Sequence, residues 1–217
     1  MATGFCDRTE AGRRLAEQLQ HYGDQSDVIV LALPRGGVPI GFELAKVLHV
    51  PLDVCLVRKL GVPNHRELAM GAIASNGIRV LNEDVVQSHH VSKFALQKVT
   101  VDELHELKRR GRAYRGDRPF PDLDGKTVIL VDDGLATGAT MRAAIAVVKQ
   151  QHPAKVIVAV PLAPPDTCDA LREEVDQVVC LVMPEPFYSL GTWYDHFDQL
   201  SDLDVRTLLE TAPAFLP

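Results

Sequence analysis

The chain has 217 residues and a formal net charge of -6. This length allows one α/β domain with a substantial core, and its 23 Lys and Arg residues are spread along the chain instead of forming a basic tail, so nucleic-acid binding is not expected. Apolar runs are shorter than the ~20 residues that cross a bilayer, and the N-terminal residues do not resemble a signal peptide. We therefore expect a cytoplasmic protein with no membrane or nucleic-acid partner.

Short apolar runs alternate with helical stretches of about 10 to 15 residues along most of the chain. The predicted core strands are 28–33, 52–59, 127–133, 155–163 and 176–184. The predicted helices packed on them include 7–22, 38–49 and 139–151. Strands with near-continuous apolar interiors are typical of a parallel sheet covered on both faces. We therefore expect an α/β fold with a doubly wound, mostly parallel, five-stranded sheet.

The middle of the chain departs from this alternation. Residues 67–82 are predicted to form two short, antiparallel strands joined by a turn at 75–77. Residues 83–118 form a long polar stretch that predicts a helical insertion of one or two helices. The basic cluster 108–118 at its end is interpreted either as a solvated helix end or as a mobile cover over bound phosphates. We expect this insertion to belong to a single domain that covers residues 1–217.

The most unusual residues follow the predicted strands, at the sheet edge where ligands bind in such folds. LPRGG (33–37) ends the first strand, LVRK (56–59) the second, and the third lies in VILVDDGLATGAT (128–140). There, Asp132 and Asp133 precede a loop of small residues and a helix start, where backbone N–H groups attract phosphate. Two carboxylates would repel a bare phosphate, but they accept hydrogen bonds from hydroxyls and bind metals. The edge therefore predicts a site for a phosphorylated sugar with a metal.

Two other phosphate-binding folds fit this stretch poorly. Receiver domains place their acidic pair near the chain start and need a Lys after a later strand. Here the pair lies past the midpoint, and no such Lys follows the strand at 155–163. A nucleotide P-loop requires GxxxxGK[ST], and the Lys of that motif is missing here.

VILVDDGLATGAT resembles the ribose-phosphate motif of type I phosphoribosyltransferases, which use 5-phosphoribosyl 1-pyrophosphate (PRPP) and Mg²⁺. LPRGG is similar to the pyrophosphate loop of that family, and LVRK resembles the RK loop of the adenine phosphoribosyltransferases. FCDRTEAG, VRKLG, RELAMGA and GTWYDHF resemble segments of bacterial phosphoribosyltransferases of unassigned acceptor. Because these motifs keep their order, the resemblance covers most of the chain and implies the type I phosphoribosyltransferase fold.

The resemblance implies a role for each motif residue. Asp132 and Asp133 would hold the ribose hydroxyls directly or through Mg²⁺, as the predicted metal ligands. The predicted substrate-binding residues of the following loop, most of which would wrap the 5-phosphate, are Gly134, Ala136, Thr137, Gly138, Ala139 and Thr140. The predicted contacts of the pyrophosphate are Arg35, Gly36, Gly37, Arg58 and Lys59, and the loop that holds the first three often has a cis peptide bond in this family.

Three of these residues, Arg35, Lys59 and Asp133, are the predicted catalytic residues. A cation beside the departing pyrophosphate would stabilise the charge that grows as the glycosidic bond breaks, which raises the rate more than the affinity.

The acceptor is not identified by the sequence. In 6-oxopurine phosphoribosyltransferases an Asp usually precedes the Thr-Gly pair, where this chain has Ala136, which argues against hypoxanthine or guanine. Adenine enzymes share the small residue but have a mobile loop in place of the long insertion. A C-terminal hood at about 184–200 has four aromatic residues that either stack on a planar ring or only close the core: Phe187, Tyr188, Trp193 and Tyr194. The candidates for a general base are Glu67, Asp195 and His196.

We therefore predict a Mg²⁺-dependent transferase that moves phosphoribose from PRPP to a nitrogen acceptor, a nucleobase or similar ring, and releases pyrophosphate. Two alternatives on the same fold are a non-catalytic PRPP-binding regulator and a phosphohydrolase acting on PRPP-like molecules. A regulator could dispense with Arg35 and Lys59, so their presence favours catalysis. The expected partners are PRPP and the acceptor, and the formation of a homo-oligomer is left open.

Overall fold

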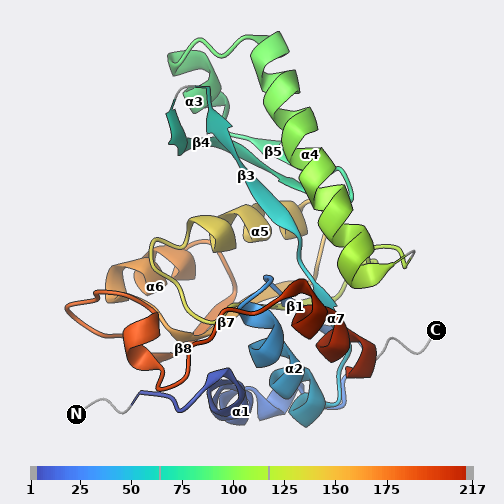
Figure 1. Cartoon of the computed structure of the whole chain (residues 1–217), viewed down its shortest axis with the longest axis vertical. Helices are drawn as coiled ribbons and strands as arrows, with labels where there is room; N and C mark the ends of the chain where they lie inside the picture. Colours follow the sequence, from blue (N-terminus) through green and yellow to red (C-terminus); the bar gives the residue numbers. More distant parts are fainter. Residues whose placement is uncertain (1–3, 64, 117, 214–217) are drawn as a thin grey trace.

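A parallel five-stranded sheet forms the centre of the computed structural model, which describes residues 4–63, 65–116 and 118–213 except the side chains of residues 66 and 67. The strand order is β2-β1-β6-β7-β8, and each pair of neighbours is parallel (Figure 1). The strands are β1 (Val28–Ala32), β2 (Leu52–Val54), β6 (Thr127–Val131), β7 (Lys155–Leu162) and β8 (Gln177–Val182). The predicted fold class is confirmed.

Helices cover both faces of this sheet because the strand interiors, such as those of β1 and β6, are apolar on both sides. Alternate residues of β1 face opposite layers, with Val30 in one cluster and Ile29 in the other. The layer around Val30 contains α1 (Arg8–Gln18), α2 (Gly37–Leu48) and α7 (Asp202–Thr211). The layer around Ile29 contains α5 (Ala139–Lys149) and α6 (Pro165–Arg172), on the upper side in Figure 1.

The first helix is shorter than predicted. It begins after Asp7, whose side chain accepts a hydrogen bond from the backbone N–H of Glu10 at 2.8 Å. Asp7 is therefore the N-cap, as its position before the apolar pattern indicates. After α1, the rest of the predicted range 7–22 forms a short 3₁₀ helix, η1 (Gln20–Tyr22).

The predicted second strand, 52–59, is two strands in two different sheets, which corrects the prediction. Only β2 belongs to the parallel sheet. The chain then leaves that sheet, and β3 (Val57–Val62) pairs antiparallel with β4 (His65–Ala74). The apolar run gave no sign of this break, because hydrophobicity does not record which neighbour a strand pairs with. Lys59 therefore lies inside β3 and not at the end of a core strand.

A smaller antiparallel sheet, in the order β3-β4-β5, rises above the parallel sheet together with two helices (Figure 1). Its third strand is β5 (Arg79–Leu81), so the antiparallel strands predicted for 67–82 are confirmed. The insertion predicted for 83–118 forms α3 (Glu83–Ser88) and α4 (Lys93–Arg115). Helix α5 lies between the two sheets, since Val57 and Ala72 of the small sheet pack against Val147. The expectation of a single domain stays a prediction.

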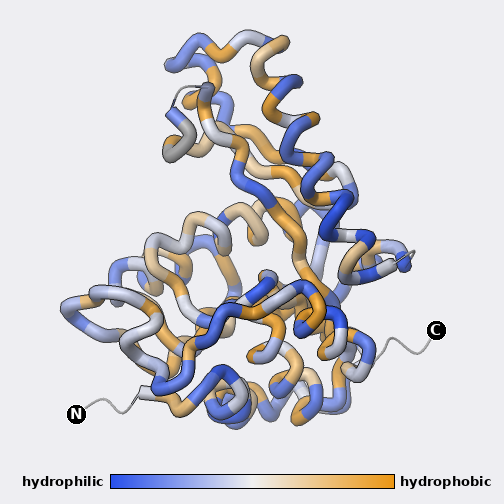
Figure 2. The backbone as a smooth tube through the Cα atoms, in the orientation of Figure 1, coloured by the Kyte–Doolittle hydropathy of each residue, from blue (hydrophilic) through white to orange (hydrophobic). Residues whose placement is uncertain are grey.

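Helix α4 is amphipathic and is anchored at its C-terminal end. Hydrophobic and hydrophilic stretches alternate along it (Figure 2), and Leu107, on its apolar face, is in the same buried cluster as Leu60 of β3. Near the end of α4, Arg115 is 7% exposed and its Nε donates to Asp53 Oδ1 at 2.8 Å. The end of the helix is therefore tied to β2. Among the described residues, no helix has the length and apolar character needed to cross a membrane.

Candidate functional site

The acidic pair and the LPRGG loop are in direct contact at the carboxyl edge of the parallel sheet. Asp132 and Asp133 follow β6, and the loop lies between β1 and α2. A Cβ at Gly36 would lie 2.0 Å from Asp133 Oδ2, so any side chain there would overlap the carboxylate. The peptide bond between Pro34 and Arg35 is cis, as the family resemblance implies. The structure therefore brings the two predicted motifs together.

Asp133 is bound by an arginine to which the sequence had assigned no role. Nε and Nη2 of Arg8 both lie 2.9 Å from Asp133 Oδ2. Nη1 donates to the backbone carbonyl of Asp198 at 3.0 Å, and the guanidinium lies 3.9 Å from the centre of the Phe197 ring. The only sequence signal for Arg8 was its place in the motif FCDRTEAG.

Burial shapes the electrostatics of the acidic pair. Desolvation raises the pKa of Asp132 well above its usual value, and the adjacent charge of Asp133 raises it further. Burial also raises the pKa of Asp133, while the Arg8 guanidinium acts in the opposite direction. A bound cation or a set of hydroxyl donors would therefore stabilise the ionised pair.

A cavity of about 310 Å³ opens beside these groups. It is lined by Arg8, Arg35, Gly36 and Asp133 and by residues 197–200 of the predicted hood. Two guanidinium groups and a carboxylate at one opening suit a ligand that has both phosphate and hydroxyl groups.

The loop after the acidic pair has the features of an anion site. Helix α5 starts at Ala139, and its N-cap, Gly138, has a φ of 70° and no side-chain hydrogen bond to the helix. The Ala139 N–H donates to Thr137 Oγ1 at 3.4 Å. The other first-turn N–H groups of a helix lack intrahelical partners, so this start has the chemistry of an anion site. Thr167 Oγ1 donates to the carbonyl of Ala136 at 2.9 Å and supports the loop from α6. Gly134 is buried, and a Cβ there would lie 2.3 Å from Leu190.

Four predicted residues of this loop, Ala136, Thr137, Ala139 and Thr140, are exposed. The helix start is therefore accessible to a ligand, but their contacts with phosphate stay a prediction.

Arg58 and Lys59 contact different neighbours. Nε of Arg58 donates to Glu103 Oε2 of α4 at 2.6 Å. Lys59 lines a cavity of about 320 Å³ together with Ala139 and Arg142 of α5. Lys59 therefore lies near the anion loop, whereas Arg58 is held by the helical insertion. The pyrophosphate contacts predicted for both residues stay predictions.

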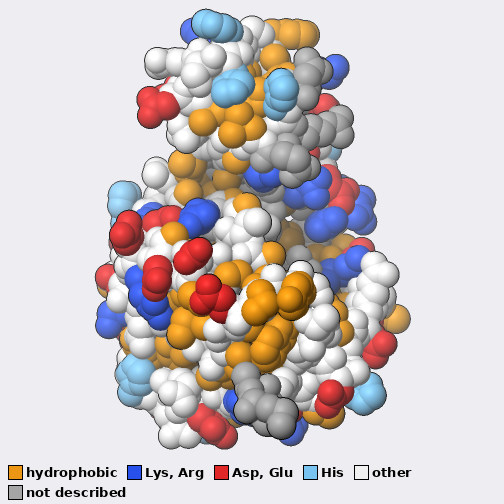
Figure 3. Space-filling model, turned by 90° about the vertical axis from the view of Figure 1, so that its left-hand side faces the viewer, with side chains coloured by type: hydrophobic (Ala, Val, Ile, Leu, Met, Phe, Trp, Pro, Cys, Tyr) orange, Lys and Arg blue, Asp and Glu red, His pale blue; other side chains and the backbone are white. Residues whose placement is uncertain are grey.

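The basic cluster 108–118 divides between the surface and the interior. Arg109 is exposed, and its Nη1 lies 3.9 Å from Asp202 Oδ2, while Arg35 Nη1 lies 4.0 Å from Asp202 Oδ1. Tyr114, which is buried, donates its hydroxyl to Asp202 Oδ1 at 2.6 Å. The start of α7 therefore connects the LPRGG loop with α4. Figure 3 shows Lys and Arg side chains gathered where the upper part of the molecule meets the body.

Of the four aromatic residues predicted in the hood, three pack against the core and one is exposed at the surface. Tyr194 is 7% exposed, and its hydroxyl donates to the carbonyl of Asp133 at 2.6 Å. The backbone carbonyl of Trp193 accepts from Phe5 N at 2.8 Å, and Phe187 packs against the main core. These three residues close the core, while Tyr188 is 83% exposed.

Three residues are the candidates for a general base, and two are the candidate ligands of a metal ion. Asp195 and His196 are exposed and do not line the cavity beside Asp133, and the side chain of Glu67 lies outside the described residues. Within the described ranges, no three His, Cys, Asp or Glu side chains form a metal cage. Mg²⁺ is commonly held by one or two carboxylates, waters and substrate phosphates, so Asp132 and Asp133 fit such an ion without a cage.

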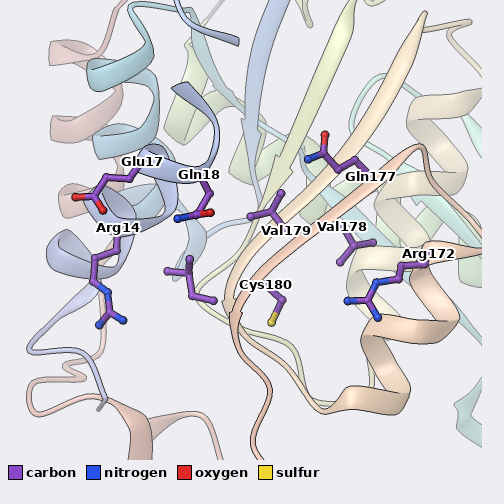
Figure 4. A pocket seen from close by; sticks show the side chains of 9 residues that line it. Arg14, Glu17, Gln18, Arg172, Gln177, Val178, Val179 and Cys180 are labelled. Carbon is purple, nitrogen blue, oxygen red and sulfur yellow. The ribbon is translucent and has the colours of Figure 1, made fainter. Parts of the chain in front are cut away.

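A larger cavity, of about 600 Å³, lies along the edge strand β8 (Figure 4). Arg14 and Glu17 of α1 line it on one side and Arg172 of α6 on the other, with Cys180 of β8 between them. None of the predicted site residues lines this cavity, so the acidic pair and its neighbours remain the candidate site.

Comparisons with known proteins identify the family of the chain. Residues 7–187 match the family described as "Phosphoribosyl transferase domain". Two Mycobacterium tuberculosis proteins are each 46% identical over 208 residues: "Putative phosphoribosyl transferase Rv0571c" of strain H37Rv and "Putative phosphoribosyl transferase MT0597" of strain CDC 1551. These matches cover 96% of this chain but 47% of the relatives, so the chain spans about half their length.

The crystal structure of TT1426 from Thermus thermophilus has a similar fold. It is 40% identical, has a TM-score of 0.87, and the match covers 95% of this chain and 98% of TT1426. Since the family match also includes the LPRGG loop, the acidic pair and the anion loop, the chain belongs to the phosphoribosyl transferase domain family.

Proposed function

We propose that the chain transfers phosphoribose from PRPP to a nitrogen acceptor and releases pyrophosphate in a Mg²⁺-dependent reaction. One observation carries this proposal: the acidic pair touches the LPRGG loop on one side and continues on the other into a helix start whose N-cap is a glycine. In this proposal, the LPRGG loop binds pyrophosphate, the acidic pair binds the ribose hydroxyls, and the helix start binds the 5-phosphate. The membership in the phosphoribosyl transferase domain family supports the proposal.

The ribose and its phosphate would be held by the stretch that follows β6. Asp132 and Asp133 would accept hydrogen bonds from the ribose hydroxyls and hold Mg²⁺. Bound Mg²⁺ would supply positive charge that offsets the charge of the phosphates. The backbone N–H groups at the start of α5 would bind the 5-phosphate with help from the helix dipole. Gly138 allows the backbone to turn into α5, since its left-handed conformation suits glycine.

Two cations, Arg35 and Lys59, would stabilise the leaving group. Arg35 lines the same cavity as Asp133, and Lys59 lies near the start of α5, on the small sheet. As the bond between the ribose and pyrophosphate breaks, negative charge grows on the pyrophosphate oxygens. Fixed cations stabilise that charge more in the transition state than in the ground state.

Pyrophosphate release tests the proposal directly. The protein is incubated with PRPP, Mg²⁺ and a pool of nitrogen bases, and release is followed with each base and with none. Release that depends on one base supports the transferase and identifies its acceptor. Base-independent release would instead favour the phosphohydrolase, and binding of PRPP without any release would favour the regulator.

A further inference from the structure

Arg8 is a mostly buried charged residue that lines the cavity beside Asp133 and to which the proposed reaction assigns no role. Its side chain is 12% exposed, and its guanidinium contacts Asp133, the carbonyl of Asp198 and the ring of Phe197. An arginine with this combination of forked and stacking contacts is held in one orientation. It brings a fixed positive charge from α1 to the carboxyl edge of the sheet.

Backbone hydrogen bonds between the segment before α1 and the hood hold Arg8 beside Asp133. Phe5 N donates to the carbonyl of Trp193 at 2.8 Å, and Asp195 N donates to the carbonyl of Phe5 at 2.9 Å. His196 N donates to the carbonyl of Cys6 at 2.9 Å, and Asp7 then caps α1. The segment before α1 is therefore paired with the hood, and Arg8 is positioned before any ligand binds.

The two carboxylates are in different situations as a result. Asp133 is ion-paired with Arg8 through Oδ2, whereas Asp132 forms no ion pair with any residue that the structure describes. Asp132 Oδ1 accepts the backbone N–H of Asp133 at 2.9 Å. Arg8 thus compensates the charge of Asp133 directly, whereas the half-buried Asp132 carboxylate has no cationic side chain in direct contact among the described residues.

We propose that Arg8 is a positioning residue that acts as a built-in cation of the acidic pair: it neutralises and orients Asp133, and leaves Asp132 as the carboxylate that serves hydroxyls and metal. This inference rests on the proposed function and narrows it, because it assigns the hydroxyls and Mg²⁺ to Asp132 and not to both carboxylates. Two uncompensated carboxylates would repel a polyanion unless a divalent cation neutralised both of them. With Arg8 in place, binding of PRPP depends less on the divalent cation.

The test compares PRPP binding with and without Mg²⁺ in calorimetric titrations of the wild type, Arg8→Gln and Arg8→Lys. In the absence of Mg²⁺, Arg8→Gln should lower the affinity by about tenfold or more. Added Mg²⁺ should bring it back to within about threefold of the wild type. Arg8→Lys keeps the charge but loses the forked geometry, so its metal-free affinity should lie between the other two.

Mn²⁺ binding to the ligand-free protein, followed by electron paramagnetic resonance, gives a second readout. Arg8→Gln should bind Mn²⁺ about tenfold more tightly than the wild type, because Asp133 becomes available beside Asp132. The double variant Arg8→Gln with Asp133→Asn removes the charge together with its partner. It should lose the added Mn²⁺ affinity and recover metal-free PRPP binding.

Arg14→Gln is the matched control, because Arg14 is also on α1 and lies 4.7 Å from the Phe5 ring but does not line the cavity beside Asp133. It should leave both readouts unchanged. The inference is overturned if Arg8→Gln weakens PRPP binding equally with and without Mg²⁺, or binds Mn²⁺ no better than the wild type. If the wild type fails to bind PRPP even with Mg²⁺, the proposed function is wrong, and the Mn²⁺ comparison still decides the role of Arg8.

Discussion

Gly36 is the residue that lets the LPRGG loop and the acidic pair meet. A methyl group at this position would lie 2.0 Å from Asp133 Oδ2, too close for either group to stay in place. We expect Gly36→Ala to displace Asp133 and to weaken PRPP binding by about tenfold or more in a calorimetric titration.

Gly111→Ala is the control for this change. Gly111 lies inside α4, and a methyl group there would lie 3.8 Å from Leu56 Cδ1, which is an ordinary van der Waals contact. It should leave PRPP binding unchanged and stabilise the helix by roughly 0.5 to 1 kcal/mol. Equal PRPP affinity in Gly36→Ala and the wild type would show that the contact with Asp133 does not matter for binding.

A substitution of Lys59 should affect turnover and PRPP affinity to different extents. The family resemblance implies that Lys59 stabilises charge developing on the pyrophosphate, and its place beside the start of α5 also puts it near the proposed 5-phosphate site. Lys59→Ala should keep PRPP affinity within about tenfold, or ~1.4 kcal/mol, while turnover falls by roughly 100- to 1000-fold. Calorimetry and pyrophosphate-release kinetics measure the two effects.

Lys93→Ala, at the exposed start of α4, controls for the loss of one positive charge and should change neither quantity. A parallel loss of affinity and turnover in Lys59→Ala would mean that Lys59 only holds the substrate. Full activity would remove it from the site.

At the scale of elements, the attachment of α4 depends on a buried ion pair. Arg115 is bound to Asp53 and to the carbonyl of Val54, and its guanidinium lies 4.9 Å from the centre of the Phe120 ring. Arg115→Met would leave the carboxylate of Asp53 buried without its partner. We expect the free energy of unfolding to fall by about 3 kcal/mol, measured by urea denaturation.

Arg112 is on the same helix and is exposed, so Arg112→Met should change the stability by less than about 0.5 kcal/mol. Adding Asp53→Asn to Arg115→Met should recover part of the loss, because the unpaired charge is removed. If Arg115→Met were as stable as Arg112→Met, the ion pair would not anchor the helix.

At the scale of the whole molecule, ligand binding should increase the free energy of unfolding. PRPP with Mg²⁺ at about 100 times its dissociation constant adds roughly 2.7 kcal/mol to the folded state, since the unfolded chain does not bind it. The melting temperature, followed by calorimetry, should therefore rise. The combined change Asp132→Asn and Asp133→Asn should abolish this rise while the chain still folds, and a flat response of the wild type to millimolar PRPP would contradict the ribose-phosphate assignment.

The sequence by itself determined the parallel sheet and the motifs at its edge. Strand interiors such as VIVLA and TVILV are apolar on both faces, and that pattern follows from burial in any sheet covered on both sides. The LPRGG loop and the acidic pair could be predicted because ligands bind at the carboxyl ends of parallel strands. The residue types of these motifs, small residues at a helix start beside carboxylates, can be read from a few neighbouring positions.

Only the tertiary structure decided which partners these motifs have. The run 52–59 divides between two sheets because β3 pairs with β4, and hydrophobicity does not specify a pairing partner. Arg8 and Asp133 are 125 positions apart, and no local pattern predicts their ion pair. Tyr194 is 61 positions from Asp133 and binds its carbonyl only because the hood packs against the end of β6. Contacts between such distant segments depend on how the elements pack, so the ion pair between Arg8 and Asp133 became visible only in the folded chain.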